Sequence, residues 1–152
     1  TFGRYLDVDG DGIPFRTYPG THPTAGAYFT RGTTKDRMAK YSEAGPDYIE
    51  NMERLLKKFE TAKSLLPRPV RRTSDIATRV GVLYYGSTSP AMDEAFELLK
   101  NDNIVVDGLR VRAFPFHEDV EKFVAAHDTV FVVEQNRDAQ LRTLLMTECD
   151  MD

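Results

Sequence analysis

Strands and helices alternate along the carboxyl-terminal half of this 152-residue chain, and that alternation limits its fold more than any other feature. Apolar runs rich in β-branched residues predict three strands, over 79–86, 109–114 and 129–134. Amphipathic segments predict a helix after each strand, over 90–100, 118–127 and 137–147. Because strands joined by helices pair in parallel through right-handed crossovers, residues 76–152 predict a small α/β domain with a parallel sheet and a βαβαβα order.

The residues that precede this domain follow a different pattern. Residues 1–45 hold seven of the ten glycines and show no sustained period, so they predict a loop-rich extension without a core of its own. Residues 46–66 predict one long helix, whose apolar side chains fall on one face: Ile49, Met52, Leu55, Leu56, Phe59 and Ala62. The segment "RPVRRTSD" has no apolar period and predicts a linker, which we place at 70–75 between the parts 1–69 and 76–152.

Charge and cysteine content exclude several classes of function. The net charge is −4 and no basic block occurs, so we expect no nucleic-acid partner. We expect no membrane association either, because no apolar run reaches membrane-spanning length. The single cysteine, Cys149, fits a reducing cytoplasm and cannot hold an iron–sulfur cluster by itself. The first residues lack an initiator Met, which predicts a chain cut from a longer one.

Polar side chains follow each predicted strand. Because the carboxyl ends of parallel strands meet at one edge of a sheet, we expect these loops to face a ligand or a partner. The residues concerned are Ser87, Thr88, His117, Glu134, Gln135, Asn136 and Arg137.

Each of these loops has more than one interpretation. The turn "GSTS" could cradle a phosphate at a helix start, or its hydroxyls could cap the helix; it lacks the Lys of a P-loop and the later glycines of a dinucleotide fingerprint. His117 suits either acid–base chemistry or a helix start. Glu134 closes an apolar strand, so its charge needs a partner, which we expect to be Arg137 or a group from another subunit.

Three aspartates, Asp7, Asp9 and Asp11, alternate in "DVDGDG" as they do at the start of a calcium loop. The EF-hand pattern then fails, because Pro14 stands at its position 8 and Tyr18 replaces its final Glu. The magnesium–diphosphate motif of thiamine enzymes also contains "GDG", but it needs an Asn further along the chain to ligate the same ion. Residues 13–50 contain no Asn, so that motif is excluded here. Two interpretations stay open: a Ca²⁺ or Mg²⁺ site completed by other groups, or a turn that is solvated or paired with Arg4 and Arg16, which are close in sequence.

Several strings, taken in order, resemble one protein family. They are "YLDVDGDGIPFRTYPGTHPTAGAYFTRGT", "YIENMERLLKKFETAKSLLP", "GVLYYGSTSPAMDEA", "LRVRAFPF" and "VFVVEQNRDAQLRTLL". Together they resemble the carboxyl-terminal part of the α subunit of 2-oxoacid:ferredoxin oxidoreductases, most of all the 2-oxoglutarate type (2-oxoglutarate synthase). The resemblance covers nearly the whole chain.

The resemblance implies a function and a division of labour between subunits. Such enzymes decarboxylate a 2-oxoacid oxidatively with thiamine diphosphate, Mg²⁺ and coenzyme A, and pass electrons through a [4Fe–4S] cluster to ferredoxin. The β subunit holds the diphosphate motif and the cluster cysteines, so we expect a cytoplasmic hetero-oligomer in which this chain is inactive alone. Residues 1–69 would be the tail of the pyrimidine-binding domain and the long helix, and 76–152 a domain like the transketolase carboxyl-terminal domain.

The resemblance carries over no catalytic residue. It implies only that His22, Arg31 and Thr33 lie toward the active-site side of the subunit. The alternative that the residues leave open is an α/β module without activity of its own, which binds a small anion or coenzyme A or serves subunit assembly.

Overall fold

The structure is a computed structural model that describes residues 3–24, 26 and 31–149. It divides into two compact units, Thr1–Ala62 and Lys63–Asp152. Helix α1 (Gly45–Leu65) begins in the first unit and ends in the second. Four residues of the "GAYFTRGT" string, 27–30, lie outside the described residues, as do the two ends of the chain.

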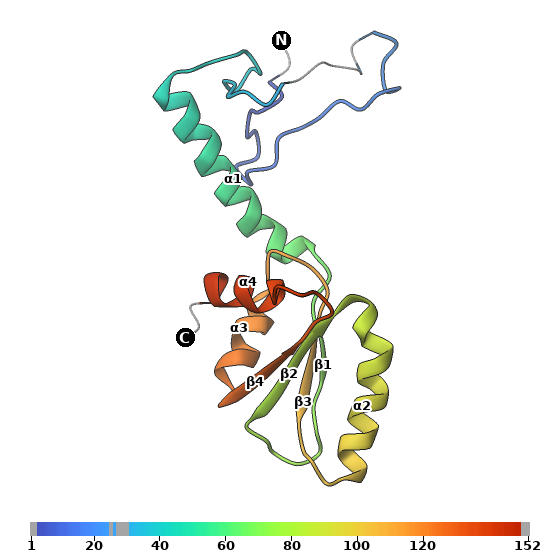
Figure 1. Ribbon diagram of the computed structural model, residues 1–152. Coiled ribbons are helices and arrows are strands. Elements are labelled where there is room, and N and C mark those ends of the chain that lie inside the picture. Colours follow the sequence, from blue (N-terminus) through green and yellow to red (C-terminus); the bar gives the residue numbers. More distant parts are fainter. Residues whose placement is uncertain (1–2, 25, 27–30, 150–152) are drawn as a thin grey trace. The chain divides into compact units, whose positions relative to one another are not determined.

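The second unit is built on a four-stranded sheet with the order β1-β3-β2-β4. Its strands are β1 (Val70–Arg72), β2 (Val80–Tyr85), β3 (Asp107–Val111) and β4 (Thr129–Val133). Strand β2 lies at the centre and pairs in parallel with both β3 and β4, whereas β1 pairs with β3 in antiparallel orientation (Figure 1). The predicted α/β class and the parallel pairing of the three main strands are therefore confirmed.

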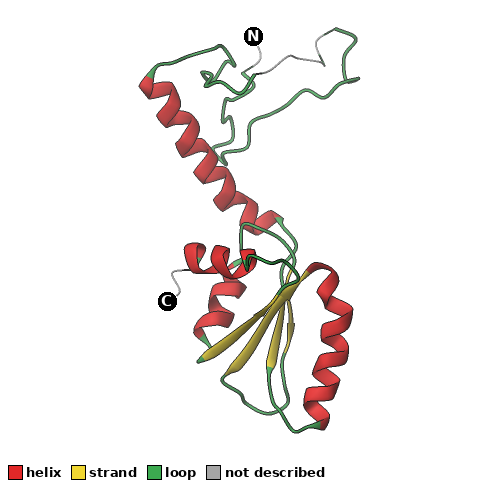
Figure 2. Ribbon diagram, viewed as in Figure 1, coloured by secondary structure: helices red, strands yellow, loops and turns green. Residues whose placement is uncertain are grey.

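Helices cover both faces of this sheet. After β2 come the short helix η1 (Gly86–Thr88) and α2 (Ser89–Asn101); α3 (Glu118–Ala125) follows β3 and α4 (Gln140–Glu148) follows β4. Figure 2 shows α2 on one side of the sheet and α3 with α4 on the other. Successive side chains of a strand point to opposite faces. Accordingly, Leu83 packs in the α3–α4 core, and Val82 and Tyr84 pack in the α2 core with Met92 and Phe96.

The linker prediction was wrong for residues 70–72, which form β1, and the sheet is therefore mixed rather than wholly parallel. An apolar period is absent there because two arginines take the place of apolar side chains. The guanidinium of Arg71 lies 5.7 Å from the ring centroid of Phe123, and that of Arg72 lies 4.9 Å from that of Phe96. Each arginine thus covers an aromatic ring in the core of a different face, by a cation–π contact.

The first unit is mostly loop, as predicted. Among its described residues before α1, the β pairing is limited to an isolated bridge between Lys35 and Tyr41. Helix α1 has the predicted extent but no buried residue, and its apolar face stays exposed, with Leu56 at 72%. Within the described residues, no helix has the length and apolar character needed to cross a membrane.

Candidate functional site

A cavity opens at the carboxyl edge of the sheet, where the sequence predicted that ligands or partners would meet the chain. Strands β2, β3 and β4 run in parallel, so Tyr85, Val111 and Val133 end them at the same edge. The cavity measures about 470 Å³ and is lined by the end of β2, by 110–114 with Phe116, and by the start of α4. The topology therefore joins segments that lie far apart in the sequence.

The chemistry of this cavity suits an anion with an apolar body. Among the described residues, its lining contains two cations, Arg110 and Arg112, and no carboxylate. The Nε atom of Arg110 is buried and has no hydrogen-bond partner among the described residues. Apolar side chains supply most of the remaining surface: Phe114, Phe116, Leu141 and Leu144. Arginine is well suited to phosphate and carboxylate groups, because its planar fork donates two parallel hydrogen bonds.

Glu134 organises the loop between β4 and α4. Its carboxylate accepts hydrogen bonds from the backbone N–H of Leu141 at 2.9 Å and of Arg142 at 3.2 Å, at the start of α4. The Asn136 amide donates to the same carboxylate and lies 3.3 Å from the hydroxyl of Tyr85. The charge of Glu134 is thus compensated by a helix start and not by Arg137, which pairs with Asp138 instead.

These contacts set the ionisation of Glu134. Desolvation acts to raise the pKa of its carboxyl, but the hydrogen bonds from Leu141, Asn136 and Arg142 lower the pKa below the usual value overall. A carboxyl with a lowered folded-state pKa stabilises the fold above its unfolded pKa and stops doing so as the pH falls through the folded value.

We expect Glu134→Ala to lower the free energy of unfolding by about 1–2 kcal/mol, because it leaves helix-start amides without an acceptor. Chemical denaturation followed by circular dichroism measures this loss. Glu94→Ala, on the exposed side of α2, is the matched control and should change stability by less than about 0.5 kcal/mol. Equal losses in the two variants would show that Glu134 does not hold the loop.

The other predicted strand-end residues have different positions. His117 is the N-cap of α3, where its Nδ1 accepts from the Asp119 N–H at 3.2 Å, so its role as a helix-start residue is confirmed. Ser87 is exposed and Thr88 is buried, and neither lines the cavity. The predicted hydroxyl cap of α2 was wrong, since Thr88 makes no side-chain cap bond. Gln135 and Arg137 are exposed.

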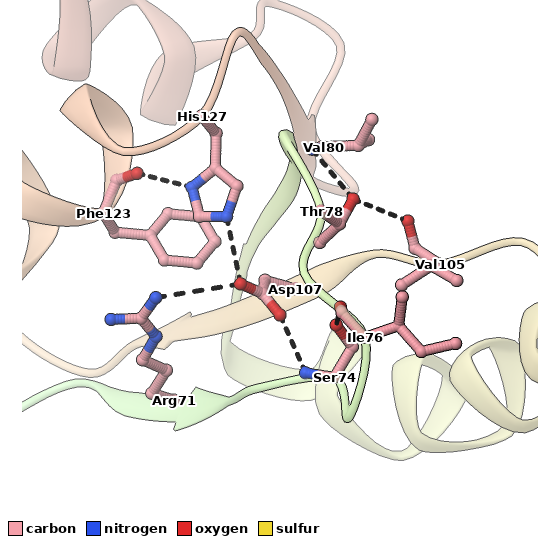
Figure 3. Close-up of polar contacts among 9 residues, drawn as sticks. All are labelled: Arg71, Ser74, Ile76, Thr78, Val80, Val105, Asp107, Phe123 and His127. Atoms are coloured by element: carbon pink, nitrogen blue, oxygen red, sulfur yellow. Dashed lines mark hydrogen bonds and ion pairs between the residues drawn. The ribbon is translucent and has the colours of Figure 1, made fainter.

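A second polar cluster, which the sequence did not reveal, lies buried near the amino edge of the sheet (Figure 3). Asp107, 6% exposed, accepts from the Ser74 N–H at 2.8 Å, and its Oδ2 lies 3.2 Å from Nε2 of His127. Nδ1 of His127 lies 2.6 Å from the Phe123 carbonyl oxygen. Both ring nitrogens of His127 therefore lie within hydrogen-bond distance of oxygen atoms.

The acidic stretch near the amino terminus forms a structural turn. The Asp7 carboxylate accepts from the N–H groups of Asp11 and Gly12, both at 3.0 Å, and Asp11 accepts from the Ile13 N–H at 2.8 Å. Of the described residues, no group of three or more His, Cys, Asp or Glu could hold a metal ion, so Asp7, Asp9 and Asp11 do not form such a group. A cation site completed by groups outside this chain stays a prediction.

Backbone contacts tie that turn to α1. Thr61 Oγ1 donates to the Asp11 carbonyl oxygen at 2.6 Å, and Arg54 donates to that of Gly12 at 3.3 Å. Of the two arginines considered as partners for the aspartates, Arg4 donates to Thr17 at 2.7 Å, and Arg16 is exposed. The aspartates thus shape the turn by accepting backbone hydrogen bonds.

The three residues expected toward an active site lie in exposed loop positions. His22 Nδ1 accepts from the Thr24 N–H at 3.2 Å, and Thr33 accepts from the Lys35 ammonium at 2.9 Å. Arg31 is also exposed. Their role toward a substrate stays a prediction.

Comparison with solved structures gives this fold a counterpart. The chain matches 2-oxoglutarate:ferredoxin oxidoreductase from Magnetococcus marinus, solved with 2-oxoglutarate, coenzyme A and succinyl-CoA bound, at a TM-score of 0.81 and 21% identity. The match covers 99% of this chain and 26% of that one, so this chain spans about a quarter of its length.

A second match carries no conclusion because its TM-score is only 0.35. It is with the alpha chain of a probable 2-oxoacid ferredoxin oxidoreductase from Thermoplasma acidophilum, at 23% identity over 56% of this chain and 74% of that one. No protein-family profile matches the chain, and no curated protein matches it significantly. The chain therefore has the fold of the corresponding quarter of the Magnetococcus marinus 2-oxoglutarate:ferredoxin oxidoreductase.

Proposed function

We propose that the chain is part of the α subunit of a thiamine-diphosphate-dependent 2-oxoacid:ferredoxin oxidoreductase, with 2-oxoglutarate as its expected substrate. The observation that carries the proposal is the fold shared with 2-oxoglutarate:ferredoxin oxidoreductase along almost the whole chain. The ordered strings of the sequence support the same family. The reaction would convert a 2-oxoacid and coenzyme A into an acyl-CoA and CO₂ and transfer a pair of electrons to ferredoxin.

The described residues of this chain do not fit the metal ion or the iron–sulfur cluster of that reaction. Its described residues form no group that could hold Mg²⁺, and the sequence has one cysteine where a [4Fe–4S] cluster needs several. We therefore assign the diphosphate site of thiamine diphosphate, its metal and the cluster to the β subunit, as the family resemblance implies. This chain would contribute the carboxyl edge of its sheet, with Arg110 and Arg112, to a hetero-oligomer.

The division of labour makes the chain inactive by itself. The purified chain, mixed with 2-oxoglutarate, coenzyme A, thiamine diphosphate, Mg²⁺ and methyl viologen, is expected to leave the dye oxidised. The control reaction adds a complete enzyme of the same type to the same mixture. Dye reduction by the chain alone would contradict the proposed division.

A second candidate function is a binding module for coenzyme A or another small anion. The carboxyl-edge cavity favours it, because it combines Arg110 and Arg112 with an apolar surface. Coenzyme A likewise combines phosphate groups with a less polar arm. An assembly role has less support at Glu134 and Asn136, since both side chains bond within the chain.

Calorimetric titration tests the second candidate. Coenzyme A is expected to bind the chain, and Arg112→Ala should weaken binding about tenfold through loss of a charged hydrogen bond to phosphate. The affinity for pantetheine, which lacks the phosphates, should be the same in this variant as in the natural chain. Lys122→Ala, a cation on α3 that pairs with Glu118, is the matched control. No heat with coenzyme A would remove this candidate.

A further inference from the structure

A second cavity, which the proposed function does not use, lies at the amino edge of the same sheet. It measures about 370 Å³ and is walled by 72–76, which leads out of β1, and by 103–106, which leads into β3. Phe96 and Lys100 of α2 complete the lining. It shares no residue with the cavity at the carboxyl edge.

Apolar side chains form much of this amino-edge cavity. Phe96 is buried, whereas Ile76 and Ile104, on the two opposing loops, are 65% and 50% exposed. Val105 and Val106 extend the same surface. An apolar group placed between the two loops would remove this surface from water, which favours the complex.

Two opposite charges at the cavity are available to a ligand. Lys100 and Asp75 both line it, are both exposed, and make no side-chain hydrogen bond or ion pair with any described residue. Arg72, by contrast, is already paired with Glu97 at 2.5 Å and lies over the ring of Phe96. A ligand therefore meets one unpaired ammonium and one unpaired carboxylate beside an apolar surface.

The loop that carries Asp75 is held in place before any ligand arrives. The Ser74 N–H donates to the buried carboxylate of Asp107 at 2.8 Å, and the Ser74 hydroxyl donates to the carbonyl oxygen of Ile76 (Figure 3). Thr78 donates to the Val105 carbonyl oxygen at 2.9 Å, which ties this loop to the opposite wall. A preformed wall reduces the ordering that binding requires.

We propose that the amino-edge cavity binds a free α-amino acid with a large apolar side chain. The carboxylate of such a zwitterion pairs with Lys100, its ammonium pairs with Asp75, and its side chain lies between Ile76 and Ile104. A cavity of this size holds a molecule as large as phenylalanine. The proposal is independent of the proposed oxidoreductase function and of the cavity at the carboxyl edge.

Three probes that differ only in charge test the proposal on the 152-residue chain. They are L-phenylalanine, 3-phenylpropionate without the ammonium group, and phenethylamine without the carboxylate. Each titration is followed by the backbone amide NMR signals of the chain. L-phenylalanine should shift the signals of Ile76, Ile104 and Val105 most, and 3-phenylpropionate and phenethylamine should shift them less. Signal shifts confined to residues of the carboxyl-edge cavity, such as Phe114, would assign binding to that edge. They would overturn the proposal and leave the proposed function unaffected.

Two charge variants then test which charged group of the ligand Lys100 and Asp75 each bind. Lys100→Gln should weaken the binding of L-phenylalanine and 3-phenylpropionate about threefold and leave the binding of phenethylamine unchanged. Asp75→Asn should weaken the binding of L-phenylalanine and phenethylamine and leave that of 3-phenylpropionate unchanged. Lys122→Gln and Asp93→Asn, at exposed helix positions outside the cavity, are the matched controls. If L-phenylalanine causes no shift at the two walls, or if both variants affect all three probes alike, the proposal is wrong.

Discussion

Gly12→Ala is expected to lower the free energy of unfolding by about 3 kcal/mol, the largest effect of any glycine substitution in the first unit. Gly12 has φ +79°, which an L-residue rarely adopts. A Cβ there would lie 2.8 Å from the carbonyl oxygen of Arg54 and closer still to the backbone nitrogen of Lys58. The substitution therefore strains the turn and also pushes it away from α1. Urea denaturation monitored by far-UV circular dichroism measures the loss.

Gly20→Ala separates these two causes. Gly20 has φ +88°, but a Cβ there would meet nothing within 4 Å. Its substitution should thus cost only the backbone strain, about 1 kcal/mol. If Gly12→Ala lowered the free energy of unfolding no more than Gly20→Ala, the acidic turn would not pack closely against α1, contrary to the structure.

Asp107→Ala is expected to destabilise the second unit by a similar amount, about 3 kcal/mol. The substitution leaves the Ser74 N–H and the His127 ring without their acceptor in a buried place. Asp128→Ala is the matched control, because Asp128 is 65% exposed and pairs with the exposed Arg79, a solvent-screened contact that adds little to stability. Similar losses in the two variants would contradict the buried network of Figure 3.

The pH dependence of stability gives this network a second test. Desolvation acts to raise the pKa of Asp107, but hydrogen bonds from Ser74 and His127 lower that pKa overall. The carboxylate therefore stabilises the fold fully above the unfolded pKa of about 3.9, and this contribution fades as the pH falls through the folded value. The stability gap between the natural chain and Asp107→Asn should shrink below about pH 4. A gap that stays constant into more acidic solution would be contrary to expectation.

Much of the fold could be predicted because its signals are local. The apolar runs of β2 and β4 and the face of α1 are each visible within one segment, and their boundaries shift by only a few residues. Strand β1 could not be found in this way. Val70–Arg72 is stabilised by pairing with β3 and by arginines over Phe96 and Phe123, which are distant in sequence.

The candidate site was predictable in place but not in detail. Parallel strands bring their carboxyl ends together, so the edge followed from topology. The partners of Glu134 depend on where α4 begins, which a sequence locates only roughly. Arg110 and Arg112 are two cations within the otherwise apolar "LRVRAF", a pattern that an ordinary strand also shows. Asp107 and His127 lie 20 residues apart, and no motif joins them.

Dye reduction by the complete enzyme tests the central claim most directly. The proposed complex of the α subunit, including this chain, with its β subunit is purified and assayed with methyl viologen in four mixtures, with and without 2-oxoglutarate and with and without coenzyme A. We predict reduction only where both are present, together with release of CO₂ and formation of succinyl-CoA. The absence of coenzyme A-dependent reduction with 2-oxoglutarate, and with other 2-oxoacids such as pyruvate, would contradict the proposed function.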